Sequence, residues 1–266
     1  MEKMDEYKNK IIEGNCVTVM REFKENSIDL TLTSPPYDNL RAYKGYVFPF
    51  NAIVKELYRI TKDGGIVVWV VNDATINGSE TGTSFKQALK FIEVGFNLHD
   101  TMIFQKTNPI PQIYRKRYNG VFEYMFVFSK GNVKTHKPLK IDCLHAGLQL
   151  NSTTYKNYSK GDQKRTKMAN PVKKQKIKGN IWTYVVGKKK EDQKAKGHPA
   201  PFPCQLAQDH INSWTNSGDI VLDPMNGSGT TCISALQLGR QYIGIDMSKE
   251  YCDLARTRIA NYKIEN

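Results

Sequence analysis

The sequence lacks any apolar run close to the roughly 18 residues that a membrane-spanning helix needs. Residues 1–7 also lack the apolar core of a secretory signal peptide. These two absences exclude integral membrane proteins and secreted proteins from the expected classes. The sequence therefore predicts a cytoplasmic protein that has no membrane as a partner.

Cysteine is scarce, and its spacing excludes two kinds of cross-link. The five cysteines are scattered, odd in number and without a Cys-x-x-Cys pair. That pattern argues against a disulfide framework and against a structural zinc site. The five histidines show no metal-ligand spacing either, so we expect no bound metal. We expect most of the cysteines to be small buried hydrophobic residues. They are Cys16, Cys143, Cys204, Cys232 and Cys252.

Acidic residues are nearly missing from one part of the chain. Residues 130–196 contain 18 Lys and Arg residues but only four acidic residues, whereas the rest contains 21 basic and 22 acidic residues. The net charge of +13 therefore comes from this segment. Such a segment is compatible with a solvated loop and also with a surface that binds the phosphates of a nucleic acid.

The chain does contain a repeated alternation of apolar runs and amphipathic segments. The continuous apolar run 66–71 is typical of a strand inside a parallel sheet, and the period of 84–94 is typical of a helix. Their alternation predicts an α/β fold, a Rossmann-like doubly wound and mostly parallel sheet. The predicted strands are 10–12, 28–32, 66–71, 100–105, 122–128, 219–222 and 242–245. The predicted helices are 17–24, 49–61, 84–94, 205–214, 230–238 and 249–262.

Three local expectations complete this outline. Gly64 and Gly65 are typical of a helix stop signal and predict the end of helix 49–61. Residues 152–157 and 158–167 are rich in polar residues and lysine, which predicts loops. The basic segment also contains aromatic residues, a mixture suited to stacking on bases. These aromatic residues are Tyr155, Tyr158, Trp182 and Tyr184.

The segment Thr33-Ser34-Pro35-Pro36-Tyr37 follows the predicted strand 28–32. It therefore lies at the carboxyl end of a strand, where open α/β sheets bind their ligands. The two prolines have a fixed φ and no N–H group, so this turn is stiff. The Ser34 hydroxyl and the Pro35 carbonyl can accept the two hydrogens of an amino group on a flat base, and the Tyr37 ring can stack on that base.

A second segment, residues 223–231, is predicted to form a strand end, a glycine loop and a helix start. Gly227 and Gly229 permit tight turns and the close approach of a ligand. Asp246 ends the next strand, where an acidic side chain accepts hydrogen bonds from ribose hydroxyls in nucleotide-binding folds. A dinucleotide site is the alternative, but Cys232 stands where its third glycine belongs. The absence of Gly-Lys-Ser/Thr excludes a P-loop.

Together, the two segments resemble a known family. Ser-Pro-Pro-Tyr resembles the catalytic motif of DNA methyltransferases that methylate exocyclic amino groups at cytosine N4 or adenine N6, with S-adenosyl-L-methionine as cofactor. Residues 223–231 resemble their cofactor loop. Because the catalytic motif comes first, the order resembles the circularly permuted beta class. The resemblance implies a class I methyltransferase fold, with residues 1–131 and 198–266 as the catalytic domain and residues 132–197 as an inserted basic region that recognises DNA.

The resemblance also implies site residues. The catalytic residues would be Ser34, Pro35, Pro36 and Tyr37. The cofactor would contact Asn15, Cys16, Thr33, Pro201, Phe202, Asp223, Pro224, Met225, Asn226, Gly227, Ser228, Gly229, Asp246 and Met247. The DNA would contact Arg41, Lys44, Lys164, Arg165, Lys167, Lys173, Lys174 and Lys176. Double-stranded DNA is the implied partner, and the family suggests a cognate restriction endonuclease and a homodimer as further partners.

Several alternatives remain open at this point. Serine at position 34 favours cytosine N4 within the family, and adenine N6 is the alternative. More distant alternatives are a catalytically idle DNA-binding protein and an RNA methyltransferase. Pro203-Cys204-Gln205 resembles the nucleophile motif of cytosine C5 methyltransferases, but here it precedes the cofactor loop. We therefore expect Cys204 to be structural.

Overall fold

The computed structural model describes residues 3–36, 48–109, 116–148, 151–155, 163–167, 171–187 and 203–265. The chain divides into two compact units. The first contains residues 1–137 and 180–266, and the second contains Pro138–Gly179. The second unit is shorter than the predicted region 132–197, because the chain returns to the first unit from Asn180 onward.

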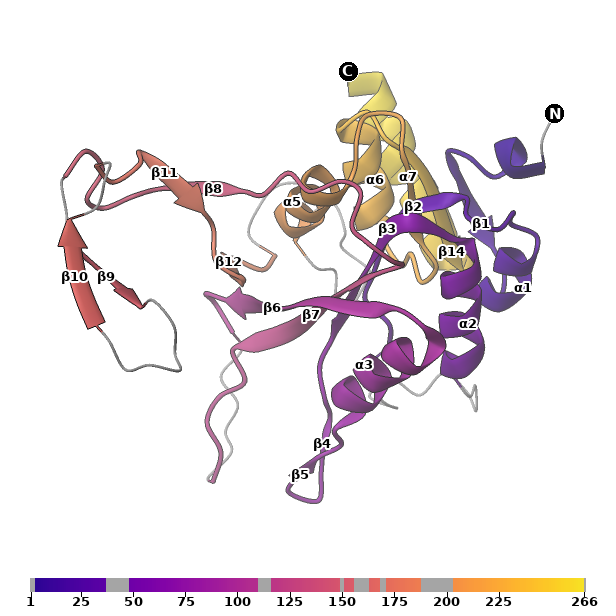
Figure 1. Cartoon of the computed structure of the whole chain (residues 1–266). Coiled ribbons are helices and arrows are strands. Elements are labelled where there is room, and N and C mark those ends of the chain that lie inside the picture. The colour runs from indigo at the N-terminus through magenta and orange to yellow at the C-terminus, as the bar shows by residue number, and fades with distance from the viewer. Residues whose placement is uncertain are drawn as a thin grey trace. The chain divides into compact units, whose positions relative to one another are not determined.

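An eight-stranded sheet forms the centre of the first unit (Figure 1). Its strands follow the order β1-β14-β13-β2-β3-β7-β6-β12. Every neighbouring pair is parallel except those of β7, which is antiparallel to both β3 and β6. The strands are β1 (Lys10–Glu13), β2 (Ile28–Thr33), β3 (Thr61–Val71), β6 (Asn97–Lys106), β7 (Phe122–Ser129), β12 (Ile181–Tyr184), β13 (Ile220–Asp223) and β14 (Gln241–Asp246).

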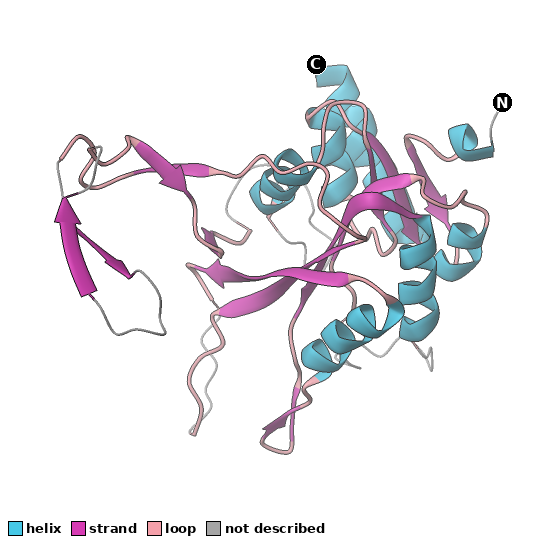
Figure 2. Ribbon diagram, viewed as in Figure 1, coloured by secondary structure: helices cyan, strands magenta, loops and turns pink. Residues whose placement is uncertain are grey.

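Helices cover both faces of this sheet, as Figure 2 shows. One group consists of α1 (Cys16–Arg21), α2 (Phe50–Ile60) and α3 (Thr83–Val94), which contact one another in that order. The other group consists of α5 (Cys204–Trp214), α6 (Thr230–Gln237) and α7 (Lys249–Glu265). The predicted doubly wound, mostly parallel sheet is therefore confirmed. A short turn, η1 (Lys3–Glu6), precedes β1, and the hairpin of β4 (Thr75–Ile76) and β5 (Ser79–Glu80) precedes α3.

The core between the sheet and the first helix group is rich in aromatic residues. The rings of Phe91 on α3 and Phe128 on β7 stack with their centroids 4.2 Å apart. Trp69 on β3 is fully buried, and its indole N–H donates to Gln87 Oε1 at 2.8 Å. This hydrogen bond matters for stability, because a buried donor without a partner raises the free energy of the folded state. No helix among the described residues is long and apolar enough to cross a membrane.

The predicted end of one helix and the predicted role of a glycine pair were wrong. Helix α1 ends at Arg21 rather than at residue 24, because Glu22 N–H donates to Val19 and Phe23 N–H donates to Met20 in a tighter final turn. Gly64 and Gly65 do not stop a helix, since α2 ends at Ile60 and β3 begins at the next residue. These glycines instead lie in an irregular part of β3, where the pairing with β2 shifts register.

The second unit contains two small antiparallel pairs. Strand β8 (Lys140–Asp142) pairs with β11 (Gln175–Ile177), and β9 (Asn151–Tyr155) pairs with β10 (Gln163–Lys167). The prediction of loops over 152–157 and 158–167 was therefore wrong within β9 and β10. Threonine and tyrosine residues favour an extended chain. Two strands can also pair their backbone N–H and C=O groups with each other when neither strand packs on a core, so the sequence need not alternate apolar and polar residues.

The prediction that Trp182 and Tyr184 belong to a surface that reads DNA was also wrong. Both lie on β12, at the edge of the large sheet, and are only 5% and 8% exposed. The Tyr184 hydroxyl donates to Asp209 Oδ2 at 2.6 Å, and the Trp182 ring packs 4.7 Å from the ring of His210. These aromatic residues hold the sheet edge against α5. Tyr155 lies on β9, and Tyr158 lies outside the described residues.

Candidate active site

The carboxyl ends of four neighbouring parallel strands bring the predicted motifs together. In the sheet order, β1, β14, β13 and β2 are adjacent. Glu13 pairs with Asp246, and Asp223 pairs with Gly244, so these strands end at one edge. The segments that follow them are the turn at Asn15, the chain at Met247, the glycine loop and Ser34-Pro35-Pro36. The topology therefore places at one edge residues that lie up to 232 positions apart in the sequence, Asn15 and Met247.

A direct hydrogen bond joins the two predicted motifs. Thr33 Oγ1, at the end of β2, donates to Asp223 Oδ1 at 2.7 Å. The N–H group of Met225 donates to the same oxygen at 3.2 Å. Asp223 is 2% exposed, and this burial raises the pKa of its carboxyl to about 6, although the hydrogen bonds act in the opposite direction. The contact fixes Ser34 beside the start of the glycine loop.

Replacing Asp223 with asparagine is expected to remove a pH dependence of stability. The folded pKa of about 6 lies above the ordinary value of 3.8. The protonated Asp223 carboxyl therefore stabilises the fold at pH values below 3.8, and this contribution to stability is lost as the pH rises through 6. Between pH 4 and pH 7.5, the wild type should therefore lose stability that Asp223→Asn keeps. The change in the free energy of unfolding over this range should differ between the two proteins by on the order of 3 kcal/mol.

Urea unfolding between pH 4 and pH 8 measures this difference. Asp63→Asn is the matched control, because Asp63 is exposed on the irregular part of β3. Its stability curve should follow that of the wild type. Parallel curves for Asp223→Asn and the wild type would show that the Asp223 carboxyl titrates normally in the folded state.

The glycine loop between β13 and α6 is tightly enclosed. Gly229 has φ +81°, and a Cβ atom there would lie 2.8 Å from Ala255 Cβ on α7. A Cβ atom on Gly244 would lie 2.6 Å from Asn226 Oδ1, which accepts a hydrogen bond from Cys232 Sγ at 3.1 Å. Larger residues at either glycine would displace the loop. Pro224, Asn226 and Ser228 are buried, and Met225 packs against the core.

Arg258 on α7 is a further loop-fixing residue that the sequence did not reveal. It is buried, and its Nη1 donates to the carbonyl of Ser228 at 2.5 Å. Its Nη2 lies 3.9 Å from the sulfur of Cys204, the first residue of α5. The only sequence signal is a cation on the face of α7 that also carries Ala255 and Ile259. The buried contact of Cys204 fits the structural role that was expected for it.

Asp246 holds the other side of the loop. Its Oδ2 accepts a hydrogen bond from the N–H group of Gly227 at 2.8 Å, and its Oδ1 accepts one from Ser248 at 2.8 Å. Burial raises the pKa of Asp246, and the backbone donors lower it. A carboxylate offers about four acceptor sites, so these two bonds leave capacity for hydroxyl donors. The next residue, Met247, is 54% exposed.

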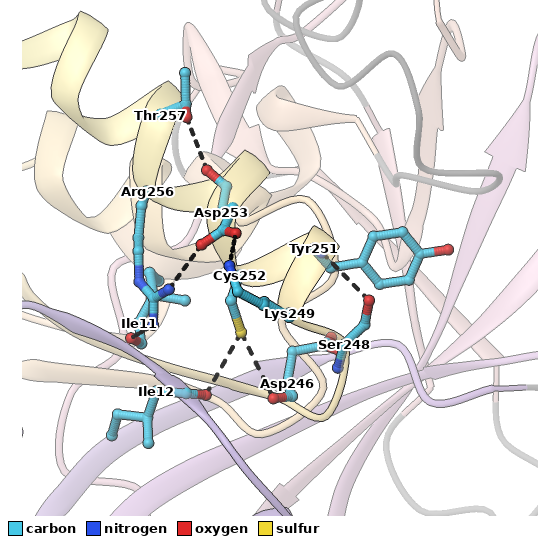
Figure 3. Close-up of polar contacts among 10 residues, drawn as sticks. All are labelled: Ile11, Ile12, Asp246, Ser248, Lys249, Tyr251, Cys252, Asp253, Arg256 and Thr257. Atoms are coloured by element: carbon cyan, nitrogen blue, oxygen red, sulfur yellow. Dashed lines mark hydrogen bonds and ion pairs between the residues drawn. The ribbon is translucent and has the colours of Figure 1, made fainter.

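Helix α7 attaches to both β1 and β14 beside this carboxylate (Figure 3). Cys252 Sγ lies 3.7 Å from the carbonyl oxygen of Ile12 and 3.6 Å from that of Asp246. Arg256 Nη2 donates to the carbonyl oxygen of Ile11 at 2.9 Å. Asp253 pairs with Lys249 and Arg256 on the exposed side of the helix. The position of Asp246 is thus set by its strand and by the helix that follows.

Asn15 and Cys16 form the start of α1 at the same edge. Asn15 Oδ1 caps the helix by accepting from Val17 N–H at 2.9 Å and from Thr18 N–H at 3.3 Å. The N–H group of Gly14 donates to the Asp246 carbonyl at 2.8 Å. Cys16 is buried, which raises the pKa of its thiol to about 11. The structure therefore places both residues beside Asp246, and their contact with a cofactor stays a prediction.

The structure describes only some of the remaining predicted residues. Ser34 is half-buried and Pro35 is buried, directly after β2. Lys173, Lys174 and Lys176 are exposed in the second unit. Lys164, Arg165 and Lys167 lie on β10, with no description of their side chains. Tyr37, Arg41, Lys44, Pro201 and Phe202 lie outside the described residues. Within the described residues, no group of three or more His, Cys, Asp or Glu side chains could hold a metal ion.

The comparison with known families decides the class of this protein. The DNA methylase family model, which groups N6 and N4 methyltransferases, matches residues 28–257. The chain belongs to this family. The predicted resemblance is therefore confirmed, and the protein is a DNA amino-methyltransferase, an enzyme of an S-adenosyl-L-methionine-dependent family that acts on DNA.

Individual relatives agree with this assignment. The orphan methyltransferase M.BamHII of Bacillus amyloliquefaciens is 51% identical over 250 residues, which cover 91% of this chain and 93% of the relative. The type II methyltransferase M.BglII of Bacillus subtilis is 25% identical, with 97% of this chain and 71% of the relative covered.

Two solved structures show the same fold. The structure of the cytosine-N4-specific PvuII DNA methyltransferase matches with a TM-score of 0.70 at 21% identity, covering 93% of this chain and 85% of that one. The crystal structure of the M1.HpyAVI–SAM complex matches with a TM-score of 0.61 at 22% identity, covering 94% and 98%. The class I methyltransferase fold expected for this chain is therefore confirmed.

Proposed function

We propose that this protein transfers the methyl group of S-adenosyl-L-methionine to the N4 amino group of a cytosine in double-stranded DNA. The observation that carries the proposal is the Thr33–Asp223 hydrogen bond, which places Ser34 next to the glycine loop. Serine at this position favours cytosine in the family that the sequence resembles. The 21% identical PvuII enzyme is described as cytosine-N4-specific, which is consistent with the proposal.

The described residues fit the proposed cofactor. Gly229 and Gly244 lie where a Cβ atom would collide with Ala255 on α7 or with Asn226, so the glycine loop can pack closely against its neighbours and keep its shape beside Asp246. Asp246 presents a half-buried carboxylate with acceptor capacity for the two ribose hydroxyls, and the exposed Met247 offers apolar contact beside it. Asn15, Cys16, Thr33 and Met225 lie at the same sheet edge.

Catalysis in this proposal consists of positioning. S-adenosyl-L-methionine supplies an electrophilic methyl group when it is bound. The target base must leave the double helix, since its amino group is paired and stacked there. Ser34 Oγ and the Pro35 carbonyl accept the amino hydrogens and direct the nitrogen lone pair, and Tyr37 stacks on the base. Holding the nitrogen in line with the methyl group lowers the barrier through proximity and orientation.

Mass spectrometry of nucleosides tests the base assignment. DNA from a host that expresses the protein should contain N4-methylcytosine, which a host with the empty vector lacks. N6-methyladenine would contradict the choice of cytosine and leave the positioning mechanism intact, because both bases present an amino group beside a ring nitrogen. Detection of only 5-methylcytosine would contradict the mechanism as well.

The basic second unit is the proposed DNA-binding region. Lys173, Lys174 and Lys176 are exposed on and before β11, in a unit that contains ten Lys and Arg residues and two acidic residues. We expect glutamate at these three positions to weaken DNA binding and to reduce the slope of log K against log salt by roughly one for each lost phosphate contact. Cofactor affinity should not change.

A matched triple variant controls for net charge. Lys24, Lys55 and Lys86 are exposed lysines of the first unit that follow α1 or lie on α2 and α3. Glutamate at these positions changes the net charge equally but should leave the salt slope as in the wild type. Fluorescence anisotropy with labelled duplex DNA at several salt concentrations gives both slopes. Equal slopes in the two triple variants would show that the β11 lysines are only a solvated surface.

Two further partners remain proposals. The description of M.BamHII as orphan favours a methyltransferase that works without a cognate endonuclease. An assay of the native host's lysate for an endonuclease that cleaves unmethylated DNA at the modified sequence tests this point. A homodimer, suggested by the beta-class resemblance, is tested by sedimentation velocity across a range of concentrations.

A further inference from the structure

The connection between β6 and β7 carries a basic and aromatic segment at the edge that holds Ser34. Because β7 is antiparallel to both β3 and β6, the carboxyl end of β6 lies at the same edge as those of β3 and β2. Figure 1 shows the described part of this connection, before β7, and the β4–β5 hairpin extending from the sheet in the same direction. The described part of the connection includes Lys116, Arg117 and Tyr118.

This segment is braced on two sides. At its base, Lys106 N–H donates to the carbonyl of Val121 at 2.8 Å. Arg117 Nη2 donates to the carbonyl of Gly78 at 2.6 Å, and Arg117 Nη1 lies 3.2 Å from Glu80 Oε1. Arg117 therefore joins the segment to the tip of the β4–β5 hairpin. A planar guanidinium that makes two such contacts fixes the orientation of the segment better than a single point charge would.

Tyr118, the next residue, projects fully into solvent. Its exposure is 101%, so its ring packs against none of the described residues. A fully exposed aromatic ring contributes nothing to the core, and both of its faces are open to a ligand. Its neighbour Lys116 is also exposed and adds positive charge. A ring next to such charge suits a nucleic acid, because bases stack on aromatic rings and phosphates attract lysine.

The strands that Ser34 and the Tyr118 connection follow lie close together in the sheet. Three strand spacings separate β2 from β6, which corresponds to roughly 14 Å. The major groove of B-DNA is about 12 Å wide. A duplex that presents one base at Ser34 therefore also covers the end of β6, where the connection that carries Tyr118 begins. DNA-bending proteins insert apolar side chains between bases.

We propose that Tyr118 stacks into the DNA at the step that the target base leaves, so that it stabilises the opened duplex while the base is at Ser34. Arg117 acts as a positioning residue that fixes the ring through the β4–β5 hairpin, and Lys116 contacts a neighbouring phosphate. This inference rests on the proposed function, because it requires a base that leaves the helix. It assigns a role in DNA binding to a residue that belongs neither to the catalytic motif nor to the second unit.

The experiment compares two DNA substrates. The modified site is first mapped by sequencing DNA from a host that expresses the wild-type protein. Duplex oligonucleotides with that site are then prepared with the target base either paired or opposite an abasic position. The variants are Tyr118→Ala, Tyr118→Phe and the control Leu89→Ala, which removes an exposed apolar side chain from α3. Methyl transfer to each duplex is measured as kcat/KM.

We expect Tyr118→Ala to lower kcat/KM on the paired duplex by roughly tenfold or more, within the range that one base–aromatic stack supplies. On the abasic duplex the loss should be several times smaller, because the target base is already unpaired. Tyr118→Phe and Leu89→Ala should resemble the wild type on both. Equal losses on the two duplexes, or no loss on either, would overturn the inference. If the wild type methylates no DNA at all, the proposed function itself fails.

Discussion

Replacing Ser34 with alanine is expected to lower the turnover number by roughly two or more orders of magnitude, as the loss of one preorganised polar group does at other active sites. The serine hydroxyl is an acceptor for one hydrogen of the target amino group. Without it, the nitrogen is no longer aligned with the methyl group. The dissociation constant of S-adenosyl-L-methionine should change little, because the variant leaves Asp246 and the glycine loop intact.

Steady-state transfer of tritiated methyl groups at saturating substrate and calorimetry of cofactor binding measure the two quantities. Ser217→Ala is a matched control, since Ser217 is an exposed serine of the same unit whose hydroxyl donates to the carbonyl of Gly239. Its turnover should equal that of the wild type. A Ser34→Ala variant with turnover within tenfold of the wild type would show that the hydroxyl is not needed for alignment.

Asp246→Ala is expected to weaken S-adenosyl-L-methionine binding by roughly 1.5–3 kcal/mol, the value of a hydrogen bond to a charged group. The structure adds a second reason for a loss. The carboxylate accepts from the N–H groups of Gly227 and Ser248, so its removal also frees the glycine loop. Asp246→Asn separates the two effects, because its amide oxygen can still accept one of these bonds while the charge is gone.

Calorimetric titration of the cofactor gives the dissociation constants. Asp253→Ala is the control, because the carboxylate of this residue lies on the exposed side of α7 and pairs with Lys249 and Arg256 (Figure 3). Cofactor affinity of this variant should remain that of the wild type. The assignment of Asp246 to the cofactor would be wrong if Asp246→Ala bound S-adenosyl-L-methionine as tightly as the wild type.

The parts of the fold that could be predicted are those in which one physical requirement dominates. Residues 66–71 are buried on both faces of the sheet, so a continuous apolar run identified them. Parallel strands then carry their following loops to one edge, which is why Ser34 and Asp223 could be predicted to lie together. The Thr33–Asp223 bond itself could not be predicted, since it depends on the register between β2 and β13.

The wrong predictions have a common physical origin. A glycine pair stops a helix or accommodates an irregular strand, and only the pairing of β3 with β2 decides between these roles for Gly64 and Gly65. Trp182 lies in a lysine-rich segment, but β12 adds to the sheet edge next to α5 and buries it. Arg258 was missed because a cation on the apolar face of a helix does not reveal its partner; Ser228 is 30 residues away in the sequence.

The pairing of β1 with β14 has a consequence for synthesis on the ribosome. Lys10 pairs with Ile243, and α7 closes over both strands through Cys252 and Arg256. At roughly 5–20 residues per second, on the order of 10–50 s separate the emergence of these two strands. Strands β2, β3, β6 and β7 can pair long before then. A nascent chain in which β14 and α7 have not yet emerged therefore presents the segment around Ser34 to DNA without a completed cofactor pocket, and methylation begins only after these two elements have emerged.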